Sequence, residues 1–161
     1  MTIGVIADTH GKINPGVFRV LQDVDLILHA GDIGSEHVIT ELESLAPVQA
    51  VTGNVDGFPL LHRWPAFWHR QLAGHSVAMT HILEKLDEST IRHLCTSAGL
   101  GRRADILIYG HTHVARVEKV AGTLTINPGA AGPARFRLKP SVGLLRLAEN
   151  KQPEWEIIQL G

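Results

Sequence analysis

The amino-acid sequence predicts an α/β fold in one domain that spans residues 1–161. Short apolar runs alternate with amphipathic segments through the first half, whereas the last third contains apolar runs joined by turn residues. Most runs in the first two thirds end on glycine, aspartate, asparagine or histidine. With 44% hydrophobic and 19% charged residues, the chain has enough apolar material for one core.

The first half reads as strand, helix, strand, helix and strand. We expect strands at residues 2–7, 25–30 and 48–51. Asn14-Pro15 has the cap and first-turn pattern of a helix start, and Ser35 can cap the second helix. Short connections of this kind predict parallel strands joined by right-handed crossovers.

The second half is expected to be mainly β-structure with one clear helix. That helix is residues 87–98, where apolar residues recur at helical spacing and Gly99 is placed to end it. Residues 58–66 read as a loop. The expected strands, with a hairpin turn at Ala121-Gly122 and a mainly antiparallel C-terminal third, are 67–73, 76–80, 104–109, 114–120, 123–126, 142–147 and 154–160.

Charge and composition exclude several classes of function. The formal net charge is −1, which gives no general field for nucleic acid or an anionic membrane. The N-terminal residues lack the features of a signal peptide, and no apolar run approaches the length of a membrane span, so we expect a cytoplasmic protein. The single cysteine, Cys95, is expected to be a packed thiol.

The segment Gly110-His111-Thr112-His113 follows a short apolar run and places two imidazoles one residue apart. Such a pair suits zinc, manganese, iron or nickel better than calcium. Gly110 is expected to permit a tight turn at the strand end. Taken alone, the pair is equally compatible with ordinary loop histidines in a chain that contains ten histidines.

Candidate ligands also follow the other apolar runs. In open α/β sheets, ligands bind beyond the carboxyl ends of the strands, so we expect these side chains to meet at one edge of the sheet. The seven candidates are two carboxylates, four imidazoles and one amide: Asp8, His10, Asp32, Asn54, His81, His111 and His113. They exceed what one four-coordinate zinc can use and suit two metal ions.

Two metal ions require a bridging carboxylate, and Asp32 is the natural candidate. Two ions bring a charge of about +4 while the two aspartates return −2, so the site keeps the positive charge that a phosphoester needs. We expect one ion to be held by Asp8, His10, Asp32 and His113. The other ion is expected to be held by Asp32, Asn54, His81 and His111.

With these motifs in order, the chain resembles the calcineurin-like metallophosphoesterases, and within them the small single-domain phosphodiesterases of bacteria and archaea. The motifs are Asp8-x-His10, Gly31-Asp32, Gly53-Asn54-x-Asp56, His81 and Gly110-His111-x-His113. The resemblance implies two mainly β sheets packed as a sandwich and flanked by helices. It implies hydrolysis of a small phosphodiester by a hydroxide that bridges two divalent ions, of manganese, iron, zinc or nickel, with manganese favoured.

The catalytic residues expected on this basis are Asp32, Asn54 and His111. The expected substrate-binding residues are Asn54 and also Arg135, which follows the glycine-rich turn after Asn127. Many family members have a histidine directly after the Gly-Asn pair, where this chain has Val55, so a dedicated general acid is in doubt. Two alternatives stay open: a phosphomonoesterase, and a non-catalytic protein-interaction scaffold like the related retromer subunit.

Three further features receive structural interpretations. His29 lies inside an apolar run and is interpreted as a core histidine rather than a ligand. Asp56 either orients a ligand or holds its own turn. The aromatic segment 64–68 is interpreted mainly as packing, and it is also a candidate contact between two copies of the chain.

Overall fold

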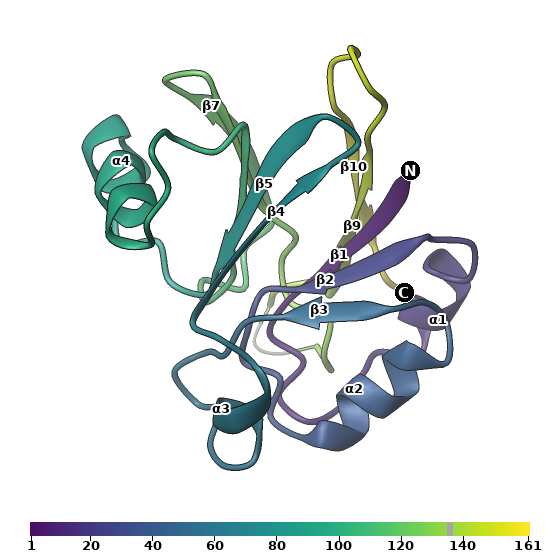
Figure 1. Cartoon of the computed structure of the whole chain (residues 1–161). Coiled ribbons are helices and arrows are strands. Elements are labelled where there is room, and N and C mark those ends of the chain that lie inside the picture. Colours follow the sequence, from purple (N-terminus) through teal and green to yellow (C-terminus); the bar gives the residue numbers. More distant parts are fainter. Residues whose placement is uncertain (135–136) are drawn as a thin grey trace.

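The computed structural model describes residues 1–134 and 137–161, and these residues form two five-stranded sheets (Figure 1). The first sheet has the order β10 (Glu154–Gln159), β9 (Ser141–Arg146), β1 (Thr2–Ile6), β2 (Leu26–His29) and β3 (Val48–Ala50). The second has the order β4 (Phe67–Leu72), β5 (His75–Thr80), β6 (Ile106–Ile108), β8 (Thr123–Asn127) and β7 (Arg116–Val120).

The strand directions agree with the sequence prediction in the first sheet. In the second sheet they agree only in part. β1, β2 and β3 are parallel, while β9 and β10 add antiparallel pairs. The hairpin between β7 and β8 turns at Ala121 and Gly122, which both have positive φ angles. The C-terminal third is less antiparallel than predicted, because the chain visits the edge strand β7 before β8 lies parallel to β6.

The helices cover the outer faces of the two sheets. α1 (Gly16–Val20) and α2 (Glu36–Glu43) lie beside the first sheet, and α4 (Glu88–Ser97) lies beside the second (Figure 1). Ser35 caps α2 by accepting the His37 N–H at 3.2 Å, and Asp87 caps α4 by accepting the Thr90 N–H at 2.8 Å. One short helix, α3 (Leu60–Arg63), lies in the segment predicted as a loop, because a single turn is too short to show helical periodicity.

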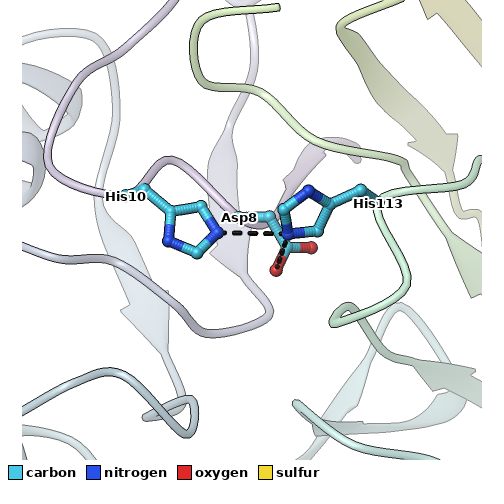
Figure 2. Close-up of side chains that lie close together, drawn as sticks. All are labelled: Asp8, His10 and His113. Atoms are coloured by element: carbon cyan, nitrogen blue, oxygen red, sulfur yellow. Dashed lines mark hydrogen bonds and ion pairs between the residues drawn. The ribbon is translucent and has the colours of Figure 1, made fainter. Parts of the chain in front are cut away.

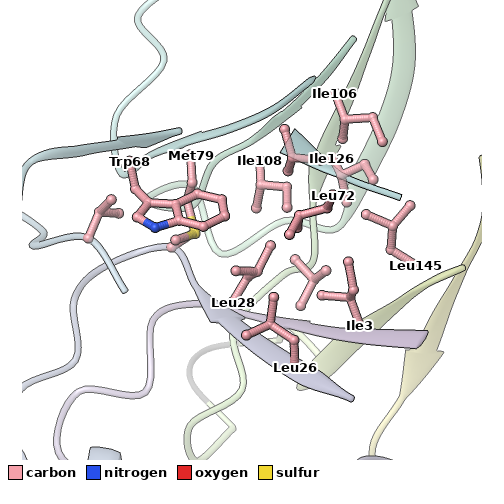
Figure 3. Close-up of a cluster of buried hydrophobic side chains, with 14 of the residues drawn as sticks. Ile3, Leu26, Leu28, Trp68, Leu72, Met79, Ile106, Ile108, Ile126 and Leu145 are labelled. Atoms are coloured by element: carbon pink, nitrogen blue, oxygen red, sulfur yellow. The ribbon is translucent and has the colours of Figure 1, made fainter. Parts of the chain in front are cut away.

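The main core lies between the sheets. Ile3 and Leu28 of the first sheet contribute to the same buried cluster as Met79 and Ile108 of the second (Figure 3). A second cluster fills the space beneath α1 and α2, and a third, which includes Cys95, lies beneath α4. The predicted fold of two mainly β sheets flanked by helices is therefore confirmed, with layers in the order helix, sheet, sheet, helix.

In the described part of the chain, none of the helices has both the length and the apolar character needed to cross a membrane. The longest is α4, with 10 residues.

Candidate metal centre

The candidate ligands follow five parallel strands that belong to two different sheets. Asp8 and His10 come after β1, Asp32 after β2 and Asn54 after β3. His81 comes after β5, and the His111–His113 pair comes after β6. The expectation of a single sheet edge is therefore wrong in one respect: the carboxyl ends of strands from both layers of the sandwich supply the side chains, and the packing of the layers brings them together.

One group of donors consists of Asp8, His10 and His113, whose ligand atoms lie within 4.8 Å of one another (Figure 2). The Nε2 atoms of His10 and His113 are 3.1 Å apart, and His113 Nε2 lies 3.4 Å from Asp8 Oδ1. Two imidazole nitrogens and a carboxylate at this spacing form the donor set of a divalent transition metal.

A second group consists of Asp32, His81 and His111, again within 4.8 Å of one another. His81 Nε2 lies 3.3 Å from Asp32 Oδ1 and 3.0 Å from Asn54 Oδ1. His111 Nδ1 lies 3.1 Å from the same Asn54 oxygen. The amide of Asn54 therefore adds a fourth donor to the second group.

Asp32 lies between the two groups. Its Oδ2 atom is 3.8 Å from His10 Nε2 in the first group, whereas its Oδ1 atom is 3.3 Å from His81 Nε2 in the second. The donor sets on both sides fit divalent metal ions, because imidazole and carboxylate donors converge on two neighbouring points and share one carboxylate. This geometry supports, for Asp32, the bridging position assigned from the sequence.

Comparison with known proteins agrees with this geometry. Residues 1–150 match the calcineurin-like phosphoesterase superfamily domain. The chain belongs to this superfamily. A probable metallophosphoesterase of Methanothermobacter thermautotrophicus is 37% identical over 168 residues, which cover 100% of this chain and 94% of that protein. Membership implies divalent metal ions, and the two donor groups are the candidate sites for them.

Solved structures show the same architecture. A structure described as that of a novel archaeal phosphodiesterase is 27% identical, with a TM-score of 0.74 over 99% of this chain and 100% of its own. Vacuolar protein sorting 29 of Cryptosporidium parvum has a TM-score of 0.77 at 19% identity, covering 99% of this chain and 97% of its own. The second likeness concerns the fold alone.

The backbone of this superfamily member is strained at the candidate ligands. Among the described residues, eight that are not glycine have positive φ angles, and five of them are candidate ligands. These five are Asp8 at 55°, His10 at 48°, Asp32 at 53°, His111 at 71° and His113 at 60°. Such conformations cost on the order of 1–3 kcal/mol each and cluster where a site fixes side-chain direction. Sequence patterns carry no signal for this feature.

Two glycines of the family motifs make room for the carboxylates. A Cβ atom on Gly53 would overlap the Asp32 carboxylate. A Cβ on Gly110 would lie 3.0 Å from Asp8 Oδ2 and 2.9 Å from the Ala30 oxygen. The expected reason for Gly110 is therefore corrected: close approach requires the glycine, while the positive φ angles fall on the histidines that follow.

Asp56 fastens two of the ligand-bearing loops together. Its carboxylate accepts the backbone N–H groups of Ile33 at 3.1 Å, Gly34 at 2.8 Å and Gly53 at 2.8 Å. The donors come from the loops after β2 and β3, which carry Asp32 and Asn54. Asp56 therefore holds its own turn and, through it, positions the candidate ligands, so the two interpretations of this residue are both correct.

His29 is a buried, fully hydrogen-bonded core histidine, as interpreted from the sequence. Its Nδ1 accepts the Gly31 N–H at 3.2 Å. Its Nε2 lies 2.9 Å from Thr9 Oγ1, whose hydroxyl donates to the Ile33 oxygen, so Nε2 carries the proton. Burial, reinforced by the nearby His81, lowers the pKa of His29 to about 3.

Asp8 and Asp32 are buried, so a nearby positive charge would stabilise their charged forms. Burial raises the pKa of Asp8 to about 7, although His81 acts against it. Burial also opposes charge on Asp32, but hydrogen bonds from His81 and from the Val55 N–H outweigh it and keep its pKa below the usual value. A divalent ion supplies the charge that stabilises a buried carboxylate such as Asp8.

The sequence placed Asn127 in a turn that resembles a late turn near the site in the family, but it did not predict the hydrogen bonds that this residue makes. Asn127, at the end of β8, donates from Nδ2 to the Gly110 oxygen at 2.9 Å and to Thr112 Oγ1 at 3.0 Å, and so holds the loop that presents His111 and His113. Arg135, the predicted substrate contact, lies outside the described residues.

Proposed function

We propose that this phosphoesterase hydrolyses small phosphodiesters with two divalent metal ions, manganese being favoured, and that Asp8, His10, His113, Asp32, Asn54, His81 and His111 hold these ions. The observation that carries the proposal is the pair of donor groups that meet at Asp32. When bound, two ions at such a site supply the positive charge that binds a phosphate and lowers the pKa of an attacking water for in-line displacement.

The residues of the chain prepare this centre for substrate. Asn54 turns its Oδ1 atom toward His81 and His111, which leaves its Nδ2 atom as an amide donor for a phosphate oxygen. His111 is exposed, whereas Asp32 and His81 are buried, so the second group opens to solvent at His111. Asp32, Asn54 and His111 are therefore the proposed catalytic residues.

The experiment uses bis(p-nitrophenyl) phosphate as substrate. We expect hydrolysis with added manganese, loss of activity with a chelator and loss in Asp32→Ala. The control is Asp23→Ala, which removes an exposed carboxylate from another part of the chain and should keep full activity. Hydrolysis that is indifferent to the chelator and to Asp32→Ala would contradict the metal-dependent mechanism.

Two other functions are compatible with the family and the fold. A phosphomonoesterase would use the same centre, and faster turnover of p-nitrophenyl phosphate than of the diester would establish it. A protein-interaction scaffold is favoured only by the likeness of the fold to vacuolar protein sorting 29. The enzyme is preferred because all seven candidate ligands are present and lie together.

A further inference from the structure

A groove of about 440 Å³ lies between the loop after β5 and one face of α4. It is lined by Ile82, Leu83, Glu84, Thr90, His93, Leu94 and Ser97. Ile82, at one end of the groove, directly follows the candidate ligand His81 in the chain, so the peptide bond joins the groove lining to the ligand set. Its volume lies in the range of small-molecule sites, roughly 300–1,000 Å³.

The start of the groove is held rigidly. His81 Nδ1 lies 2.7 Å from the Ala30 oxygen, and the Gly110 N–H donates to the His81 oxygen at 3.0 Å. Because His81 is fixed on both sides, the position of Ile82 is fixed with it. Ile82 leaves 42% of its surface exposed, so it offers apolar surface next to a buried histidine.

Apolar exposure recurs around the centre. Val55 follows Asn54 and is 54% exposed, and Val114 follows His113 and is 48% exposed. Three candidate ligands are thus each followed by an exposed aliphatic side chain. The border of the site is apolar at these points, whereas its centre is polar.

The chemistry of the groove suits a flat ring with a polar edge. Ile82, Leu83 and Leu94 supply apolar surface, while Thr90, His93 and Ser97 supply hydrogen-bonding groups along one side of α4. Among the described residues that line the groove, none is a lysine or arginine and one, Glu84, is acidic, so this lining favours an uncharged ring over a second phosphate.

We propose that this groove binds an aromatic substituent, either an aryl group or a nucleobase, of the ester whose phosphate is held at the metal centre. The proposal rests on the proposed function, because it names the class of substrate for the same site. The ring lies on Ile82 and Leu94, and its polar edge faces the side chains of α4.

The test measures binding without catalysis. The zinc-loaded protein, with labelled isoleucine, leucine and valine methyl groups, is titrated with phenylphosphonate and with methylphosphonate, two non-hydrolysable ligands that differ only in the organic substituent. We expect phenylphosphonate to bind about tenfold more tightly, because the ring buries apolar surface. We also expect it alone to shift the methyl signals of Ile82, Leu83 and Leu94.

Two substitutions on exposed positions of α4 form a matched pair. His93→Trp fills the groove, so phenylphosphonate and methylphosphonate should then bind with about equal affinity. Thr96→Trp places the same side chain on the same helix outside the groove and should keep the preference. Ile82→Asn removes apolar surface at the start of the groove and should lower the preference several-fold.

Equal affinities of the two phosphonates for the unsubstituted protein would overturn the groove proposal, as would methyl shifts confined to residues outside the groove. Equal effects of His93→Trp and Thr96→Trp would overturn it as well. If the preference holds but no diester is hydrolysed, the proposed function fails and the groove stands. If diesters are hydrolysed without any preference for the ring, the groove proposal fails alone.

Discussion

His10 Nε2 and His113 Nε2 lie 3.1 Å apart, although 103 positions separate the two residues in the chain. His10 follows a strand of the first sheet and His113 follows a strand of the second. The first donor group therefore contains side chains from both layers of the sandwich. His111 belongs to the other donor group. One short loop thus supplies a ligand to each half of the centre.

This division predicts that His111→Ala and His113→Ala remove different ions. Each variant loses one of the donors around one ion only, so each should keep about one metal ion per chain after dialysis. Anomalous scattering from metal-loaded crystals should place the remaining ion near Asp8 in His111→Ala and near His81 in His113→Ala. Retention of the same ion in both variants would refute the assignment.

Asp56→Ala should destabilise the protein and weaken its activity. The substitution leaves three backbone N–H groups without their charged acceptor, so the free energy of unfolding should fall by about 3 kcal/mol. The loops that carry Asp32 and Asn54 lose their connection, so metal affinity should fall as well. Urea unfolding and metal titration measure the two effects.

The control for Asp56→Ala is Asp23→Ala, which removes an exposed carboxylate and should change the free energy of unfolding by less than about 0.5 kcal/mol. A similarly small change in Asp56→Ala would contradict the role assigned to Asp56.

His29 should make the folded protein sensitive to mild acid. Its pKa is about 3 in the folded chain against an ordinary 6.5, so between these values the unfolded chain binds a proton that the folded chain does not. The contribution of His29 is complete above pH 6.5 and is lost as the pH falls toward 3. From pH 7.5 to 5.0, the native protein should lose about 2 kcal/mol more stability than His29→Gln.

Urea unfolding of both proteins with a chelator measures this difference, because other titrating groups contribute equally to each. His37→Gln is the control, since the His37 side chain is 73% exposed. It should follow the native protein. Parallel pH profiles of the native protein and His29→Gln would show that His29 does not titrate as its burial requires.

The leaving group should control the rate, because Val55 occupies the position where the family resemblance leads us to expect a histidine. Val55 is 54% exposed beside the centre, and its N–H donates to Asp32 Oδ1 at 3.1 Å. Without a general acid there, aryl diesters should be hydrolysed much faster than alkyl diesters. Val55→His should raise the alkyl rate by up to about 10²-fold and change the aryl rate little. Similar rates for alkyl and aryl diesters in the native protein would disprove this prediction.

Much of the fold follows from local sequence. Apolar runs predicted the strands, because a strand buried on both faces needs nearly continuous apolar residues. Ser35 predicted the start of α2 through its capping group, and the helical spacing of apolar residues predicted α4. α3 escaped prediction because one helical turn has no period to detect. The parallel pairing of β6 and β8 also escaped, because strand order depends on contacts between distant residues.

The sequence by itself determined the identity of the seven candidate ligands, since each follows an apolar run that ends a strand. Only the tertiary structure decided that they come from two sheets, that Asp56 joins the loops after β2 and β3, and that Asn127 holds the loop after β6. The physical reason is that the end of a strand fixes the position of the side chain that follows it, which is a local property. Whether the seven side chains meet depends on how the two sheets pack. That packing is set by the shared core, to which distant residues such as Leu28 and Ile108 contribute together.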